Sequence, residues 1–236
     1  MRPQCKVASA FLFVLAVVAT PAEAVWALAL YLICLVGLTA LAGIGLRFVL
    51  RRLTVETPFL LFVVFLPFLG GGARIDVLGL SLSSEGLWGA WNIFAKATLG
   101  TWVTLLLAST TQVADLLRGL ERLKVPRAIT SVAGFMVRYG DVITGEMKRM
   151  RIARLSRGYD PSWIWQARAV ASSAGTLFIR SFERGERVYL AMISRGFQGT
   201  LPAPPDEHGA RYEWPVALAL PGAAACVAAA AWASAF

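Results

Sequence analysis

The sequence is poor in the residues that bind metals. Its 236 residues include one His, His208, and three Cys. The cysteines, Cys5, Cys34 and Cys226, lie far apart, and two of them stand inside apolar runs. Without a C-x-x-C pair or a Cys/His cluster, neither a zinc site nor a disulfide framework is predicted. We therefore expect no metal site and no cofactor in this chain.

The motifs of common enzymes are also missing. The chain has no P-loop, no G-x-S-x-G, no H-E-x-x-H and no Asp-rich cluster. We predict that the protein is not an enzyme. Because it carries no ATP-binding motif, any energy that it uses comes from another protein.

Charged residues are scarce, and acidic ones are in the minority. Only 16% of the residues are charged, whereas 57% are hydrophobic; soluble domains are about a quarter charged. This balance indicates an integral membrane protein. The 23 Lys and Arg outnumber the 14 Asp and Glu, for a net charge of +9. In a membrane protein the positive-inside rule explains such an excess, so no nucleic-acid partner is expected.

Long apolar runs predict about five transmembrane helices, since roughly 20 apolar residues span the hydrocarbon core. They lie at about 7–20, 24–46, 53–69, 90–109 and 214–232. The first run has two interpretations. Ala22-Glu23-Ala24 has the form of a signal-peptidase site, but the second run follows after almost no spacer. We favour a retained helical hairpin through Pro21.

Loop charges give the predicted orientation. The loop after the second run holds Arg47, Arg51 and Arg52, and the stretch 112–213 holds 16 Lys and Arg. The positive-inside rule places both in the cytoplasm, with the N-terminus, and leaves Gly70–Gly89 outside.

The predicted architecture is an all-α membrane protein with a cytoplasmic helical region. Residues 1–111 form the first four transmembrane helices, 112–200 the cytoplasmic region, and 201–236 a linker and the last transmembrane helix. Helical apolar spacing and the punctuation by Pro126 and Pro161 predict one short and two long cytoplasmic helices. They cover about 112–123, 126–157 and 161–195.

A repeat marks the ends of the two long cytoplasmic helices. Ser156-Arg157-Gly158-Tyr159 recurs later in the chain as Ser194-Arg195-Gly196-Phe197. The same offset relates Arg149 to Arg187 and Ala153 to Ala191. Each glycine suits the left-handed position that ends a helix.

The repeat has a structural and a functional interpretation. An Arg near a helix C-terminus complements the helix dipole, which accounts for one copy. Two matched copies are harder to explain by capping alone. They suit a partner with two similar acidic grooves, onto which each guanidinium can fork.

The chain resembles the transmembrane T component of energy-coupling factor (ECF) transporters, most closely the cobalt type called CbiQ. The resemblance covers nearly the whole length and rests on the order and spacing of short motifs. They are Ser84-Glu85-Gly86-Leu87, Leu107-Ala108-Ser109-Thr110-Thr111, the segments 120–126, 135–139 and 146–158, Phe178 to Arg184, and Ala191 to Phe197.

The resemblance implies a coupling role in an importer in the cell membrane of a prokaryote. It assigns docking on two ATP-binding-cassette ATPases, which bind the ATP, to two triplets: Ser156, Arg157, Gly158 and Ser194, Arg195, Gly196. It also implies a separate membrane subunit that binds the substrate. Cobalt is the expected substrate; nickel and vitamins remain alternatives.

Other polar residues are weaker candidates for coupling or support. Arg138 and Glu146 lie on the second cytoplasmic helix and form either a polar network with Tyr139 and Asp141 or solvent and headgroup contacts. Arg180, Arg184 and Arg187 share a face of the third, where Glu183 precedes Arg187 by four residues.

Two further candidates are Lys96, inside the fourth transmembrane run, and Glu85, shortly before it. Glu85 and Lys96 are eleven residues apart, which puts them on one face of a helix. An intramembrane Lys is a functional candidate, although a Lys near a membrane end commonly snorkels to the headgroups.

A different functional hypothesis is a lipid-modifying membrane enzyme that uses the arginines of the third cytoplasmic helix on headgroup phosphates. It needs a nucleophile, a metal cluster or a general base near the membrane, and the sequence offers no convincing set.

Overall fold

The computed structural model describes residues 2–69, 71, 74–77, 80–159, 167–198 and 213–235. The chain divides into two compact units. One holds the chain up to Gly119 together with the C-terminal helix, and the other begins at Leu120 and includes the two longest helices after it.

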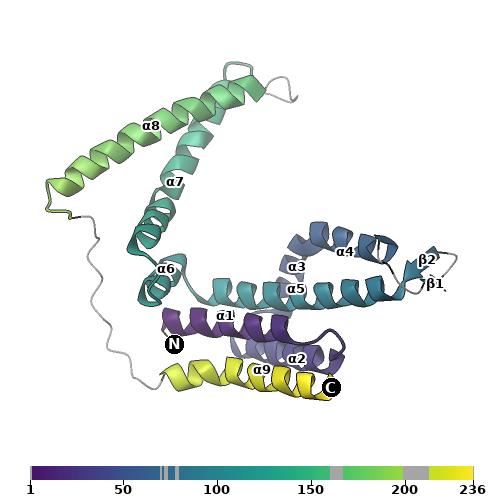
Figure 1. Ribbon diagram of the computed structural model, residues 1–236. Coiled ribbons are helices and arrows are strands. Elements are labelled where there is room, and N and C mark those ends of the chain that lie inside the picture. The colour runs from purple at the N-terminus through teal and green to yellow at the C-terminus, as the bar shows by residue number, and fades with distance from the viewer. Residues whose placement is uncertain are drawn as a thin grey trace. The chain divides into compact units, whose positions relative to one another are not determined.

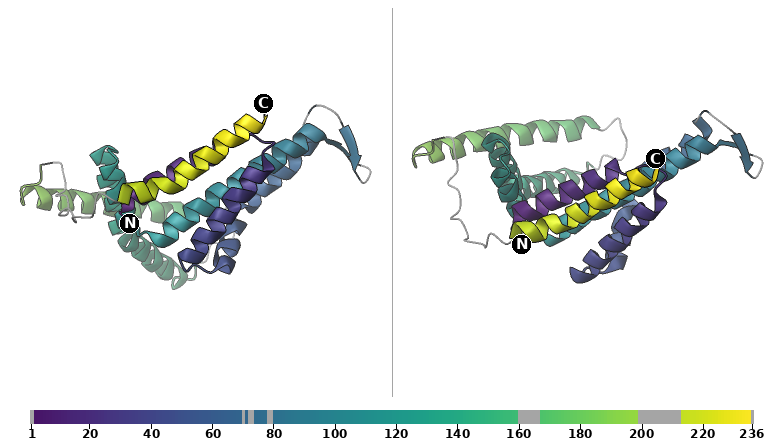
Figure 2. Two further views of the ribbon diagram at one scale, coloured as in Figure 1. Left: turned by 90° about the horizontal axis from the view of Figure 1, so that it is seen from below. Right: turned by 60° about the horizontal axis from the view of Figure 1, so that its bottom comes forward.

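The first unit is built mainly of helices (Figure 1), and most of them are apolar. They are α1 (Pro3–Ala19), α2 (Val25–Leu41), α4 (Thr57–Leu69), α5 (Ser84–Thr110) and α9 (Glu213–Ala235). Helix α1 packs along α9 and α5, and α5 also packs on α2 and α4 (Figure 2). Two of the helices, α5 and α9, are long and apolar enough to cross a membrane, while α1 and α2 are shorter apolar helices of 17 residues.

Hydrogen bonds made by buried side chains join these helices inside the core. The Tyr31 hydroxyl donates to the Ala224 carbonyl at 3.0 Å and lies 3.1 Å from the Thr20 hydroxyl. The Trp102 indole donates to the Thr39 hydroxyl at 3.0 Å. Buried polar groups are stable only when they are paired, so these contacts fix the rotation of each helix about its axis.

The run predicted at 24–46 is a helix only as far as Leu41. Gly43 takes a φ of +67°, and the Ile44 N–H donates to the Thr39 carbonyl at 3.2 Å, which closes a Schellman cap. The short helix α3 (Leu46–Leu53) follows, with Arg51 and Arg52 in its last turn. Its apolar residues extend the hydrophobic run in sequence although they belong to a separate helix.

The predicted third crossing, 53–69, starts later than expected. The residues Thr54–Glu56 form a 3-10 turn, η1, and α4 begins at Thr57. Because Pro58 lacks an N–H, it fits the first turn of α4, where no intrahelical partner is available.

The predicted helical architecture is confirmed, with one small hairpin in addition to the helices. Strands β1 (Arg74–Val77) and β2 (Leu80–Ser83) pair antiparallel within the predicted outside loop Gly70–Gly89, with Ile75 opposite Leu82. Helix α5 then begins at Ser84, six residues before the predicted crossing at 90. The Ser83 hydroxyl accepts the Gly86 N–H at 3.2 Å and caps this helix, as Ser, Thr, Asp and Asn commonly do.

The second unit contains α7 (Arg127–Leu155) and α8 (Ala167–Ile193), which are 29 and 27 residues long. The short helix α6 (Val113–Arg122) precedes them and spans the division between the units. These three helices correspond to the predicted helices at 112–123, 126–157 and 161–195. The predicted start at Pro161 and the Pro-rich stretch 201–205 lie outside the described residues.

Candidate functional site: the ends of helices α7 and α8

The two copies of the repeat fold into the same cap. The N–H of Tyr159 donates to Arg154 O at 3.1 Å, and the N–H of Gly158 donates to Leu155 O at 2.9 Å. At the end of α8 the same bonds run from Phe197 to Met192 O at 3.0 Å and from Gly196 to Ile193 O at 2.9 Å. Both sets define a Schellman motif, so the match in sequence is also a match in backbone geometry.

Glycine is required at both caps because the backbone there is left-handed. The φ angles of Gly158 and Gly196 are +74° and +83°. A residue with a Cβ in this region costs roughly 1–2 kcal/mol. The preceding Ser156 and Ser194 each return a hydroxyl hydrogen bond to a carbonyl of the last turn.

Arg157 and Arg195 are exposed, like the Ser and Gly residues on either side of them. Each occupies the last position before the left-handed glycine, where the helix has ended. We call Ser156-Arg157-Gly158 and Ser194-Arg195-Gly196 the docking ends, after the role that the resemblance predicts for them. Each presents a planar, permanently charged donor group that can bind a carboxylate in a bidentate manner.

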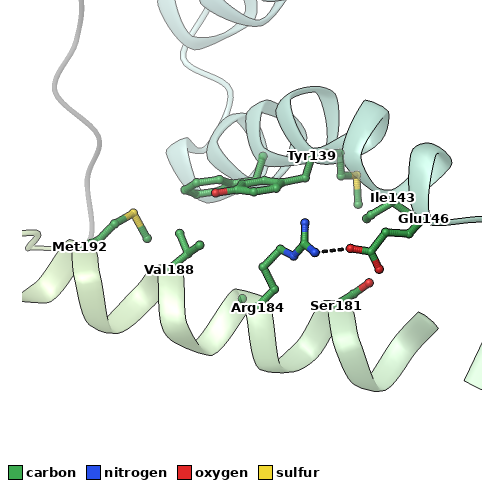
Figure 3. Close-up of a pocket in the computed structure, with 10 residues that line it drawn as sticks. Tyr139, Ile143, Glu146, Ser181, Arg184, Val188 and Met192 are labelled. Atoms are coloured by element: carbon green, nitrogen blue, oxygen red, sulfur yellow. Dashed lines mark hydrogen bonds and ion pairs between the residues drawn. The ribbon is translucent and has the colours of Figure 1, made fainter. Parts of the chain in front are cut away.

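Helices α7 and α8 are joined by an ion pair between Glu146 and Arg184 (Figure 3). Glu146 is 9% exposed, and the side chain of Arg184 is 38% exposed. The pair borders a cleft of about 300 Å³ between the two helices. The cleft is mostly apolar, and its lining includes Phe135, Tyr139, Val188 and Met192.

The remaining predicted residues of this unit are placed differently. Arg138 and Arg180 are exposed. Within the described part of the chain, no hydrogen bond or ion pair joins Arg138 to Asp141 or Glu146. Glu183 and Arg187 form the i,i+4 pair at 4.0 Å on the exposed surface of α8, where such pairs contribute little to stability.

The arginine face predicted for α8 is therefore divided. Arg184 turns toward α7, whereas Arg180 and Arg187 face outward. Large aromatic side chains also face outward on this helix: Phe178 is 72% exposed and Phe182 is 65% exposed. They leave an apolar surface on α8 that the described residues do not cover.

Lys96 and Glu85 both belong to α5, in the first unit. The Lys96 ammonium donates to the carbonyls of Val18 at 2.9 Å and Thr20 at 2.7 Å. These carbonyls end α1, so the Lys complements the negative end of that helix dipole. Glu85 is exposed in the first turn of α5.

The joining of Glu146 to Arg184 was not foreseen from the sequence. Helical spacing in the sequence groups Glu146 with Arg138, and Arg184 with Arg180 and Arg187. A signal was available, because the interval between Glu146 and Arg184 in the sequence equals the offset of the repeat.

No metal site emerges from the described residues, which bring together no group of three or more His, Cys, Asp or Glu. His208 lies outside them.

Comparison with known proteins gives a match to one family. A family model described as cobalt transport protein, CbiQ, matches residues 1–205. The similar proteins include a cobalt transport protein CbiQ of Rhodobacter capsulatus, 28% identical over 59% of each chain. An energy-coupling factor transporter transmembrane protein EcfT of Staphylococcus aureus is 24% identical over 85% of this chain and 80% of its own.

A putative fused cobalt transport protein CbiMQ of Methanocorpusculum labreanum is also similar, with 27% identity over 61% of this chain and 25% of its own. The chain spans between a quarter and three fifths of the length of the first curated relatives that it matches.

Proposed function

Because the chain belongs to the CbiQ family of cobalt transport proteins, we propose that it is the coupling subunit of an ECF-type importer. In this role the protein transmits motion from two ATPases to a separate membrane subunit that binds the substrate. It carries out no catalysis itself. The observation that carries the proposal is the pair of docking ends, whose matching caps each present one exposed Arg.

Two equivalent ends on one chain suit two equivalent partner sites. The ATPases are expected to form a dimer, and each monomer is expected to offer an acidic groove to one Arg. The exposed aromatic side chains of α8, including Phe178 and Phe182, supply an apolar surface for the substrate-binding membrane subunit or for lipid.

Cobalt is the proposed substrate, and its binding site is assigned to the partner membrane subunit. The family description and two relatives' names refer to cobalt transport. Other relatives are named only as EcfT, so nickel and vitamins are the alternatives that a transport assay must separate.

The decisive experiment is co-expression of this chain with an ATPase pair and a candidate substrate-binding subunit. We expect the ATPases to co-purify with the chain in detergent and ATP-dependent Co²⁺ uptake into vesicles. Uptake of Ni²⁺ or a vitamin by the same complex would change the substrate and keep the coupling role. A chain that retains no ATPase would contradict that role.

Membrane orientation gives a separate prediction. The excess of Lys and Arg places α7 and α8 in the cytoplasm and the hairpin outside. A membrane-impermeant maleimide on intact cells should therefore label Gly71→Cys and should reach Val170→Cys only after permeabilisation. Both positions are exposed, so accessibility on the protein does not bias the result. Labelling of position 170 in intact cells would reverse the orientation.

Metal binding is predicted to be weak in this chain alone. One His and three scattered Cys offer no convergent ligand set. Calorimetry of the purified chain with Co²⁺ should detect no site tighter than about 1 μM. A stoichiometric nanomolar site would place the metal in this subunit, whatever the partners do.

A further inference from the structure

The Glu146–Arg184 ion pair occupies equivalent positions of the repeat. The offset that relates Arg157 to Arg195 and Gly158 to Gly196 also relates Glu146 to Arg184. Glu146 and Arg184 therefore hold the same position in the two copies of the repeat, and their contact joins the copies at that position. Two copies of one pattern that touch at equivalent positions are related by a local two-fold axis through the contact.

The pair also lies at equal distances from the two docking ends. Eleven residues separate Glu146 from Arg157, and eleven separate Arg184 from Arg195. Continuous helix fills both intervals up to Leu155 and Ile193. At 1.5 Å per residue each Arg lies about 16 Å along its helix from the pair.

The two helices run in opposite directions past this contact. In Figure 3 Tyr139 precedes Ile143 and Glu146 from left to right, whereas Met192, Val188, Arg184 and Ser181 follow in descending number. The docking ends therefore extend away from the pair on opposite sides.

The chemistry of the ion pair suits a contact that must persist while the helices move. Glu146 is buried, and a buried charge that loses its partner is costly. Beside the pair, the apolar cleft separates the two helices, which are not closely packed at that point. The side chains around the cleft therefore leave room for the helices to tilt.

We propose that Glu146 and Arg184 are positioning residues that form a pivot for α7 and α8. The pair prevents the helices from sliding past one another while it allows them to rotate. Equal arms then give both docking ends the same displacement when two ATPases approach or separate. This inference rests on the proposed function, because it presupposes that the docking ends are driven by ATPases.

Distance measurements on the native pair test the pivot directly. Spin labels are placed, after replacement of Cys5, Cys34 and Cys226, at equivalent positions near the pair (Lys148 and Glu186) or far from it (Leu155 and Ile193). These positions are two and nine residues past the pair, and all four are exposed. Rotation about the pair should change the far distance at least four times as much as the near one between the ATP-free and ATP-bound complexes, because displacement grows with arm length. Equal changes in both distances would overturn the pivot.

Substitutions test whether the pair is needed for coupling. In the assembled complex, Glu146→Gln should keep the ATPases bound and hydrolysing ATP. The Co²⁺ imported per ATP hydrolysed should fall by about fivefold or more, the usual size of a coupling effect. The reversed pair Glu146→Arg with Arg184→Glu should recover most of this ratio, because the two positions are equivalent.

Glu183→Gln is the matched control. It makes the same chemical change in an ion pair that lies on the exposed surface of α8 and joins no second helix. Its coupling ratio should equal that of the unmodified protein. A normal ratio in Glu146→Gln with ATPases bound would overturn the pivot alone, whereas failure of the unmodified chain to retain ATPases would count against the proposed function. If Glu146→Gln does not fold, the distance measurement decides.

Discussion

Replacement of both Arg157 and Arg195 by alanine is expected to abolish ATPase co-purification and ATP-dependent uptake. Each guanidinium is exposed at a helix end and is proposed to enter an acidic groove. Removing one partner of a desolvated charge pair typically costs about 2–5 kcal/mol. Each single variant should weaken assembly, and the double variant should be the weakest. Pull-down of the ATPases and uptake into vesicles measure the two effects.

Two comparisons separate docking from general loss of charge. Arg157→Lys and Arg195→Lys should rescue poorly, because an ammonium cannot make the bidentate contact. The double variant Arg138→Ala, Arg180→Ala removes one exposed Arg from each of the same helices and should assemble normally. If the docking Arg residues only complement helix dipoles, their loss costs about 1 kcal/mol or less. A double variant at 157 and 195 that assembles and transports normally would establish that case.

The helix ends could be predicted from the sequence because a Schellman cap is local. All its hydrogen bonds lie within six consecutive residues, and the left-handed position selects glycine. The two caps at Gly158 and Gly196 can therefore be predicted from the local sequence. The apolar runs were similarly informative, since helices occupy most of each run.

Interruptions inside apolar runs were less visible. The segment from Ala24 to Leu46 has almost no polar residue, yet Gly43 ends α2 and Leu46 begins a separate helix. The hydrophobicity of a segment indicates that its side chains are buried or contact lipid. It does not indicate where the chain changes direction and one helix ends. The apolar run at 90–109 begins six residues after the start of α5, because Ser84, Glu85 and Gly86 in the first turn are polar or small although the helix is already formed.

Long-range partners were the least predictable part of the candidate site. Helical spacing places Arg184 near Arg180 and Arg187, but only tertiary packing decides which of them meets Glu146. Lys96 illustrates the same limit, since the carbonyls that it contacts belong to the end of α1, far earlier in the chain. The offset of an internal repeat is the one sequence signal that indicates such distant partners. It applies only where the two copies of the repeat contact each other.

Gly86→Ala is expected to destabilise the first unit by roughly 2–4 kcal/mol, as the sum of overpacking and the loss of a cap. An added Cβ would lie 2.8 Å from the Pro67 Cα and 2.9 Å from the Leu66 carbonyl oxygen. Both are backbone atoms of α4, so they cannot rotate away as a side chain can. Relief requires α5 to move from α4, which disturbs the hydrogen bond from the Gly86 N–H to the Ser83 hydroxyl. The midpoint of heat-induced aggregation in detergent, followed by size-exclusion chromatography, measures the loss.

Gly89→Ala provides the matched control, one helical turn further along the same helix. There the added Cβ would lie 3.7 Å from the Leu66 Cδ2, an ordinary contact with a flexible side chain. Its effect should stay within about 0.5 kcal/mol, as for substitutions that meet no special feature. The contrast between the two variants depends only on the close approach of α4 and α5 at Gly86. Equal midpoints for both variants would mean that this approach is looser than the 2.8 Å contact requires, and Gly86 would then have no packing reason to be glycine.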